Sequence, residues 1–199
     1  MTSIYLIRHG ATDDIGKRIS GWLPGVHLNP VGVTQAAKLA VRISRAGISA
    51  IYSSPLERTM ETAHALAARF GLEVTQLPAL GEVHFGDWTG RTFDELDRIR
   101  EWRLFNSFRS STRPPGGELM LEVQRRIVSQ LTELRQRHPH QTIAVLSHGD
   151  VIRAAVCHFL GIPLDLLLRF EISPASVTIL RISAEEASIL RINDTGEEE

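Results

Sequence analysis

The order of apolar and polar residues along the chain predicts strands that alternate with helices. Short apolar runs rich in β-branched residues indicate buried strands, and they occur at residues 3–7, 48–52, 73–77, 142–146, 177–182 and 187–192. Apolar residues at helical spacing predict helices, which fall at residues 33–43, 55–70, 118–137 and 150–160. Ser54 and Thr92 are predicted helix N-caps, and Glu95 completes a capping box at the second of them. Residues 101–115 are expected to be irregular.

This alternation indicates an α/β fold with three layers, an α/β/α sandwich around a mainly parallel sheet of about six strands. The last two predicted strands are joined by too few residues for a helical crossover, so one strand is expected to run antiparallel. The chain shows no repeat and no clear boundary, which predicts a single domain over residues 1–199. Residues 193–199 end in consecutive glutamates and are expected to form a flexible tail.

Composition narrows the classes of partner and compartment. The chain has 199 residues, of which 43% are hydrophobic and 23% charged, as in ordinary globular proteins. A net charge of −1 favours neither nucleic acid nor an anionic membrane, so any attraction for an anion must be local. No apolar run is long enough to span a bilayer or to act as a signal peptide, which predicts a cytoplasmic protein. The one cysteine, Cys157, cannot form an internal disulfide.

Two predicted strands end in a histidine followed by a glycine. Residues 3–7 lead into Arg8-His9-Gly10, and residues 142–146 lead into Ser147-His148-Gly149. Parallel α/β sheets bind ligands beyond the carboxyl ends of their strands. The two imidazoles are therefore expected to face one pocket.

The polar residues that follow successive strands suit phosphoryl transfer through a histidine. They include Arg8, His9, Arg58, Glu82 and His148. A neutral imidazole can attack phosphorus, arginine forks can hold phosphoryl oxygens, and a carboxylic acid can protonate the leaving alkoxide. A metal site is the rival explanation for two histidines. However, no Cys, Asp or Glu lies at metal-ligand spacing from either one, so neither a metal nor another cofactor is expected.

Six motifs, in order along nearly the whole chain, resemble those of the histidine phosphatase (phosphoglycerate mutase-like) superfamily. They read Arg8-His9-Gly10-Ala11-Thr12, Gly21-Trp22, Ser54-Pro55-Leu56-Glu57-Arg58, Glu82-Val83-His84-Phe85-Gly86-Asp87-Trp88-Thr89-Gly90, Pro114-Pro115-Gly116-Gly117-Glu118 and Ser147-His148-Gly149. The tripeptide at the first histidine is weak by itself. The ordered set is specific.

The resemblance implies a role for each matched residue. His9 is the phosphorylated nucleophile, and Glu82 is the proton donor. Arg8, Arg58 and His148 complete the phosphate pocket and contact the substrate, as does Glu82. Substrate contacts are also implied for the hydroxyl of Ser20, the adjoining Gly21, the backbone N–H of Gly149 and the Thr12 side chain.

One segment departs from the family pattern. The family often has an asparagine a few residues after the first histidine motif, and it contributes to phosphate binding. Here the first asparagine is Asn29. Thr12, Lys17 or backbone N–H groups are the candidates to replace it, and Asp13 and Asp14 are expected to disfavour a second anionic group nearby.

The expected function is a phosphomonoesterase of the histidine acid phosphatase type, acting on a small phosphorylated metabolite through a phosphohistidine. A cofactor-dependent phosphoglycerate mutase is the first alternative, and a non-catalytic module that binds phospho-ligands or proteins is the second. The family's mutases carry an extra segment before the long later helix. In this chain the segment before that helix is short, which favours the phosphatase over the mutase. The sequence does not identify the substrate, and it is compatible with a homodimer.

The segment between the Glu82 motif and the long later helix is rich in arginine. We expect most of these side chains to be solvated on an amphipathic helix, with one or two of them over the pocket to bind a second anionic group of the substrate. The candidates are Arg98, Arg100, Arg103, Arg109 and Arg113.

Overall fold

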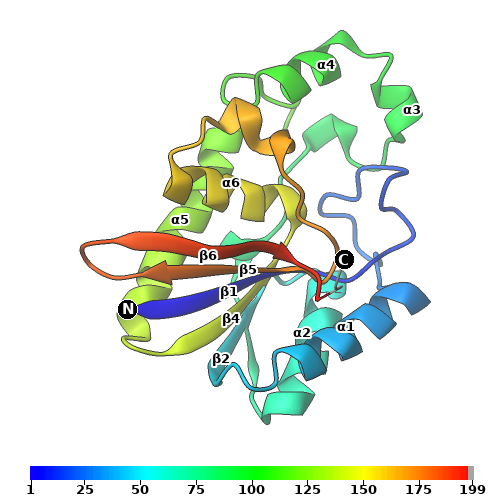
Figure 1. The fold of residues 1–199 in the computed structure, drawn as a ribbon. Coiled ribbons are helices and arrows are strands. Elements are labelled where there is room, and N and C mark those ends of the chain that lie inside the picture. The colour runs from blue at the N-terminus through cyan, green and yellow to red at the C-terminus, as the bar shows by residue number, and fades with distance from the viewer. Residues whose placement is uncertain (197–199) are drawn as a thin grey trace.

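A computed structural model describes residues 1–196, which form one six-stranded sheet with helices on both faces (Figure 1). The strands lie in the order β3-β2-β4-β1-β5-β6. Their bounds are β1 Thr2–Arg8, β2 Ile48–Ser53, β3 Val74–Gln76, β4 Thr142–Ser147, β5 Val177–Ile182 and β6 Ala187–Asp194.

The sheet is mainly parallel. β1 pairs with β4, β4 with β2, and β2 with β3, all in parallel. β5 runs antiparallel to both of its neighbours, β1 and β6. These pairings confirm the expected mixed sheet with one reversed strand.

Successive side chains of each strand point to opposite faces of the sheet, so the hydrophobic core has a larger half on one face and a smaller half on the other. Ile4 and Val145 face the larger half, while Ile7 and Leu146 face the smaller. Helices α5 and α6 cover the larger half, and α1 and α2 cover the opposite face of the sheet (Figure 1). This confirms the three-layer sandwich and leaves the carboxyl ends of the parallel strands free to carry loops.

The helices follow the predicted order, with different ends. Their bounds are α1 Pro30–Arg42, α2 Glu57–Phe70, α3 Phe93–Leu96, α4 Arg100–Ser107, α5 Met120–Arg137 and α6 Gly149–Leu160. Within residues 1–196, 3-10 helices occupy Pro78–Leu80, Gly86–Trp88 and Leu164–Arg169. Thr92 and Glu95 form the predicted capping box of α3.

Two local predictions were wrong. Ser54 does not cap α2, because the cap position is Leu56 and the Ser54 hydroxyl contacts His148 instead. Residues 101–115 are not irregular throughout, since α4 runs to Ser107. Trp102 and Phe105 bury their rings on one side of that helix, and this packing stabilises it.

The predicted tail begins too early. β6 continues to Asp194, and the amide of Asn193 accepts a hydrogen bond from the backbone N–H of Ser173 at 2.5 Å. The last three residues of that predicted tail, 197–199, lie outside the described residues.

Candidate active site

Pairing of β1 with β4 brings the two His-Gly motifs side by side. Arg8 lies opposite Ser147 in the parallel register, and the backbone N–H of His9 donates to the Ser147 carbonyl at 3.2 Å. The next residue on each strand is a histidine. The rings of His9 and His148 lie with centroids 5.2 Å apart at an angle of 61°.

Arg58 reaches both imidazoles from the first turn of α2. Its Nε donates to His9 Nε2 at 3.3 Å, and its Nη2 approaches His148 Nδ1 at 3.3 Å. Nη2 also donates to the Gly21 carbonyl at 2.9 Å. Burial lowers the pKa of Arg58, and the carboxylate of Glu82 opposes this shift. A buried guanidinium in contact with two histidines forms a local positive centre.

Two buried guanidinium N–H groups next to the histidines have no hydrogen-bond partner within residues 1–196. They are Nε of Arg8 and Nη1 of Arg58. Nη1 of Arg8 is already engaged, since it donates to the Ile172 carbonyl at 2.6 Å. The unengaged N–H groups can bind the oxygens of an anion.

The hydrogen bonds of His9 fix its tautomer. Nδ1 lies 2.7 Å from the Gly10 carbonyl, which can only accept, so Nδ1 carries the proton. Nε2 accepts from Arg58 and therefore holds the lone pair. The pKa of His9 lies well below 6.5, because burial and the charges of Arg58 and Arg8 disfavour the imidazolium. His9 thus presents a neutral, nucleophilic nitrogen.

His148 has the opposite tautomer. Its Nδ1 faces an Arg58 N–H and accepts, so the proton sits on Nε2, which donates to Ser54 Oγ at 2.8 Å. Burial, followed by Arg58 and His9, holds the pKa of His148 well below 6.5. The Ser54 hydroxyl therefore fixes the ring that stands beside the nucleophile.

Glu82 projects toward this pair from the loop after the 3-10 helix Pro78–Leu80. Its Oε2 lies 3.7 Å from His148 Nδ1, and its Oε1 accepts from the backbone N–H of Val83 at 2.9 Å. Burial and the nearby Asp150 raise the pKa of Glu82, against the opposing charge of Arg58. A carboxyl group with a raised pKa can hold a proton for transfer.

A cavity of about 320 Å³ joins these groups. Among the residues predicted to contact substrate, its lining includes Arg8, His9, Thr12, Ser20, Gly21, Arg58, Glu82 and Gly149. His148 lies behind the lining and reaches the site through Arg58 and Glu82. Lys17 is exposed and is not part of the lining, which leaves Thr12 as the nearer side-chain candidate to replace the asparagine.

Charged side chains from α6 and from the segment after α4 form another part of the cavity wall. Arg109 is almost fully buried, and its Nη1 donates to Asp150 Oδ2 at 2.7 Å. Asp150 also accepts from Arg153 at 3.1 Å. Although burial raises the pKa of Asp150, the two arginines lower it overall. Asp150 and Arg153 had no motif in the sequence, and Asp150 was detectable only as the residue after the second His-Gly pair.

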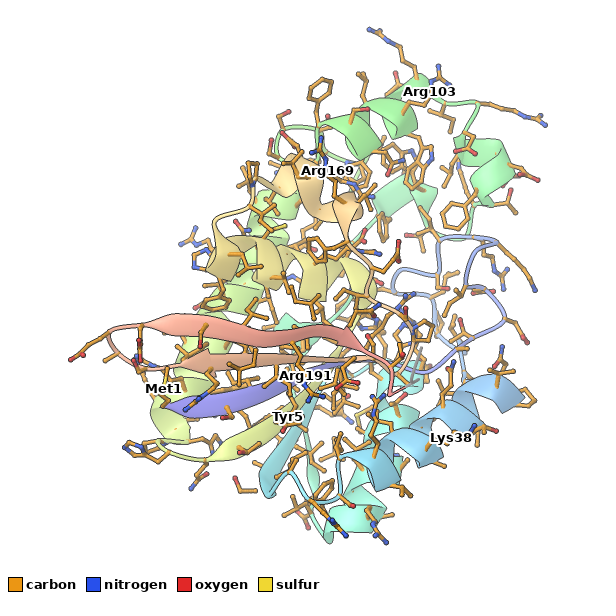
Figure 2. The ribbon with its side chains drawn as sticks, in the orientation of Figure 1. Met1, Tyr5, Lys38, Arg103, Arg169 and Arg191 are labelled. Carbon is orange, nitrogen blue, oxygen red and sulfur yellow. The ribbon has the colours of Figure 1, made fainter. Side chains whose placement is uncertain are left out.

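Only Arg109, among the five arginines of this segment, lines the cavity. Arg113 forms an exposed ion pair with Glu122 at 2.7 Å. Arg103 lies on α4 at the outer end of the molecule (Figure 2). Arg98 and Arg100 are absent from the lining as well.

Aromatic side chains attach α4 to the Glu82 side of the cavity. Trp102 lines the cavity and meets Trp88 edge to face, with ring centroids 5.5 Å apart. Phe105 packs against both tryptophans and lies under the Arg109 guanidinium at 4.2 Å. This packing holds Arg109 over the cavity.

Within residues 1–196, no cluster of three or more His, Cys, Asp or Glu side chains is arranged to hold a metal ion. None of the helices described has the length and apolar character needed to cross a bilayer. The fold and the cavity together define an α/β protein with an arginine-lined pocket built around a neutral histidine.

Residues 4–195 match the family model of the histidine phosphatase superfamily, branch 1. Phosphoserine phosphatase 1 of Hydrogenobacter thermophilus is 33% identical, over 98% of this chain and 93% of that protein. YhfR of Bacillus stearothermophilus has a similar structure, with a TM-score of 0.92, 29% identity and 98% of each chain covered. A mutant phosphoserine phosphatase of Entamoeba histolytica, in complex with phosphoserine, gives a TM-score of 0.87 at 26% identity, with 98% of each chain covered. The chain belongs to the histidine phosphatase superfamily.

Proposed function

We propose that the protein hydrolyses the phosphomonoester of a small metabolite through a phosphohistidine at His9. The observation that carries this proposal is the state of His9. Its Nε2 is neutral, lies 3.3 Å from Arg58 and is free of a proton, because Nδ1 donates to the Gly10 carbonyl. Family membership and the phosphatase relatives support the same reaction.

In the first step, Nε2 of His9 attacks phosphorus while the bond from phosphorus to the alcohol oxygen breaks. Glu82 transfers its proton to that oxygen, so the alcohol leaves neutral. The unengaged N–H groups of Arg8 and Arg58 bind the phosphoryl oxygens and stabilise the charge that builds up on them. The Gly10 carbonyl accepts from Nδ1 and stabilises the phosphorylated imidazolium.

In the second step, water attacks phosphorus and the phosphorus–nitrogen bond breaks. The Glu82 carboxylate takes the proton of the water and returns to its starting state. His148 stays next to the His9 ring and the Glu82 carboxyl group, held by Ser54. Inorganic phosphate then leaves, and the enzyme is restored.

The acidic side chains of the cavity support hydrolysis rather than transfer to a second phosphorylated molecule. Asp14 and Asp150 both line the cavity and form ion pairs with arginines of the lining, Arg18 for Asp14 and Arg109 and Arg153 for Asp150, so these arginines have less charge to offer a second phosphate. Asp150 also neutralises part of the charge of Arg109. We propose a substrate with one phosphate and at most a carboxylate besides, in line with the phosphoserine bound by the Entamoeba relative.

Trapping of the intermediate tests the mechanism. A ³²P-labelled phosphomonoester is mixed with the enzyme and quenched in base, and the label should be stable there but lost in acid. His9→Ala should not label, whereas His158→Ala, an exposed histidine on α6, should label like the wild type. A wild type that never labels, or a His9→Ala variant that still turns over, contradicts the proposal.

A panel of substrates separates the phosphatase from the mutase. Phosphoserine, 3-phosphoglycerate and sugar phosphates are each tested for release of phosphate, and 3-phosphoglycerate is also tested with 2,3-bisphosphoglycerate. Release of phosphate without isomerisation is expected. The raised pKa of Glu82 predicts an acid phosphatase profile, in which the rate of the first step falls as pH rises through that pKa.

A further inference from the structure

The loop that carries Glu82 is bound to α5 by a single arginine. Arg126 donates from Nη1 to the carbonyls of Ala79 at 2.8 Å and Gly81 at 2.7 Å. Its Nη2 donates to the carbonyl of Glu82 itself at 3.0 Å. Three backbone carbonyls within four residues therefore converge on one guanidinium.

Glu118, two residues before α5 begins, orients this guanidinium. Its Oε1 accepts from Arg126 Nε at 2.8 Å, and its Oε2 accepts from Nη2 at 3.2 Å. Oε2 also accepts from the backbone N–H of His84, on the far side of Glu82, at 3.2 Å. The side chains of Arg126 and Glu118 are only 20% and 15% exposed, so their ion pair is shielded from water.

A glycine in each of the two loops allows the Pro114–Glu118 segment to touch the Glu82 loop through backbone atoms. Gly86 has a φ of +55°, and a Cβ there would lie 2.0 Å from the Pro115 carbonyl oxygen. A Cβ on Gly117 would lie 2.4 Å from the His84 carbonyl oxygen. The Pro114–Glu118 motif thus has a physical reason: it fixes the Glu82 loop from one side, and Arg126 fixes it from the other.

The carboxyl group of Glu82 depends on this backbone for its position. Within residues 1–196, its one contact at hydrogen-bond distance is with the adjacent N–H of Val83, at 2.9 Å. Trp22 Nε1 donates to the Glu82 carbonyl at 2.7 Å, which again holds the main chain and not the side chain. A shift of the main chain therefore moves the carboxyl group directly.

We infer that Arg126 and Glu118 are positioning residues for proton transfer by Glu82, an inference that rests on the proposed function. They touch neither the cavity nor the reacting atoms. They hold the main chain at Ala79, Gly81, Glu82 and His84, so that the carboxyl group meets the leaving oxygen. Misplacement of a catalytic group by about 1 Å can cost on the order of 100-fold in rate.

The choice of leaving group tests this role. Phosphoserine releases a poor alkoxide that needs the proton of Glu82, whereas p-nitrophenyl phosphate releases a stabilised anion that needs none. Rapid-quench measurement of phosphohistidine formation isolates the first step for both substrates. For Arg126→Gln we expect a loss of about 10- to 100-fold with phosphoserine and less than about threefold with p-nitrophenyl phosphate. Glu118→Gln should show the same selectivity to a smaller extent.

Three further variants complete the design. Glu82→Gln defines the full selectivity that loss of the proton donor produces. Arg126→Lys keeps the charge but cannot reach three carbonyls and Glu118 together, so it should recover only part of the rate. Arg125→Gln changes an exposed arginine on the same helix and should leave both rates unchanged. Thermal unfolding of each variant shows that the fold is kept.

The outcomes are distinguishable. The positioning role would be overturned if Arg126→Gln and Glu118→Gln lost the same rate with both substrates, or lost none, in an experiment where Glu82→Gln does show the selectivity. Absence of phosphohistidine in the wild type, or of selectivity in Glu82→Gln, would overturn the proposed function instead. If Arg126→Gln does not fold, the ratio of rates in Arg126→Lys and Glu118→Gln decides in the same way.

Discussion

Acidification is expected to destabilise the folded protein through its two buried histidines. His9 is 4% exposed and His148 is fully buried, and both have a pKa well below 6.5 because burial and Arg58 disfavour the imidazolium. The unfolded chain, in contrast, protonates both rings near their ordinary pKa of about 6.5. The unfolded state therefore binds more protons as the pH falls. The stability contributed by the neutral rings is complete above pH about 6.5 and is lost below it.

The size of this loss follows from the pKa in the unfolded chain. While a ring stays neutral in the folded protein, lowering the pH from 7 to 5.5 removes about 1.25 kcal/mol of the free energy of unfolding per histidine. The two rings together give about 2.5 kcal/mol. Glu82 acts in the opposite sense, because its raised pKa makes the folded protein bind a proton more readily. Comparing the loss of unfolding free energy in histidine variants with that of the wild type separates the histidine contribution from that of Glu82.

Urea unfolding at pH 7 and pH 5.5 measures the effect. His9→Gln and His148→Gln should each lose about 1.25 kcal/mol less than the wild type on acidification. His158→Gln changes an exposed histidine and should lose as much as the wild type. The reasoning is refuted if either active-site variant keeps the wild-type pH dependence, since its imidazole would then not be held neutral in the folded state.

Three further perturbations address single contacts. Gly86→Ala should lower the free energy of unfolding, measured with urea, by about 2–4 kcal/mol, because its φ is +55° and a carbonyl oxygen lies 2.0 Å from the new Cβ. As a control, Gly25→Ala has a φ of +74° but open space around the new Cβ, and it should lower that free energy by about 1 kcal/mol. Ser54→Ala leaves the His148 Nε2–H without its acceptor and should cost about 1–3 kcal/mol while lowering kcat; an unchanged kcat would contradict the proposed role of this ring. Arg109→Leu tests whether Arg109, which lines the cavity, binds the carboxylate of the substrate. It should raise KM for phosphoserine at least about tenfold and change KM by less than about twofold for phosphomonoesters without a second charged group. Equal changes in KM for both kinds of substrate would reject this contact.

The sequence located the parts of the fold and site that depend on local patterns. Apolar runs marked all six strands, and the residues that follow two of them, His9 and His148, lie with their rings 5.2 Å apart, although only His9 lines the cavity. Arg58 and Glu82 followed because each comes soon after a strand or at the start of a helix. A site at the carboxyl end of a parallel sheet can therefore be predicted from the residues that follow each strand in the sequence.

The remaining features depend on contacts between distant segments. Serine is a residue type favoured at helix N-caps, yet the hydroxyl of Ser54 accepts a hydrogen bond from a histidine 94 positions later. The ion pair of Arg109 with Asp150 joins residues 41 positions apart. Arg126 reads in the sequence as an ordinary charge on an amphipathic helix, because the carbonyls that it binds belong to a loop 44 to 47 positions earlier.

The distribution of the indole rings gives the molecule a built-in optical probe. The chain has three tryptophans. Trp22 donates to the main chain at Glu82, Trp102 lines the cavity, and Trp88 packs against Trp102. All of the tryptophan emission therefore originates beside one end of the sheet. A change in fluorescence on addition of phosphate or vanadate would report events at that end directly, without an introduced label.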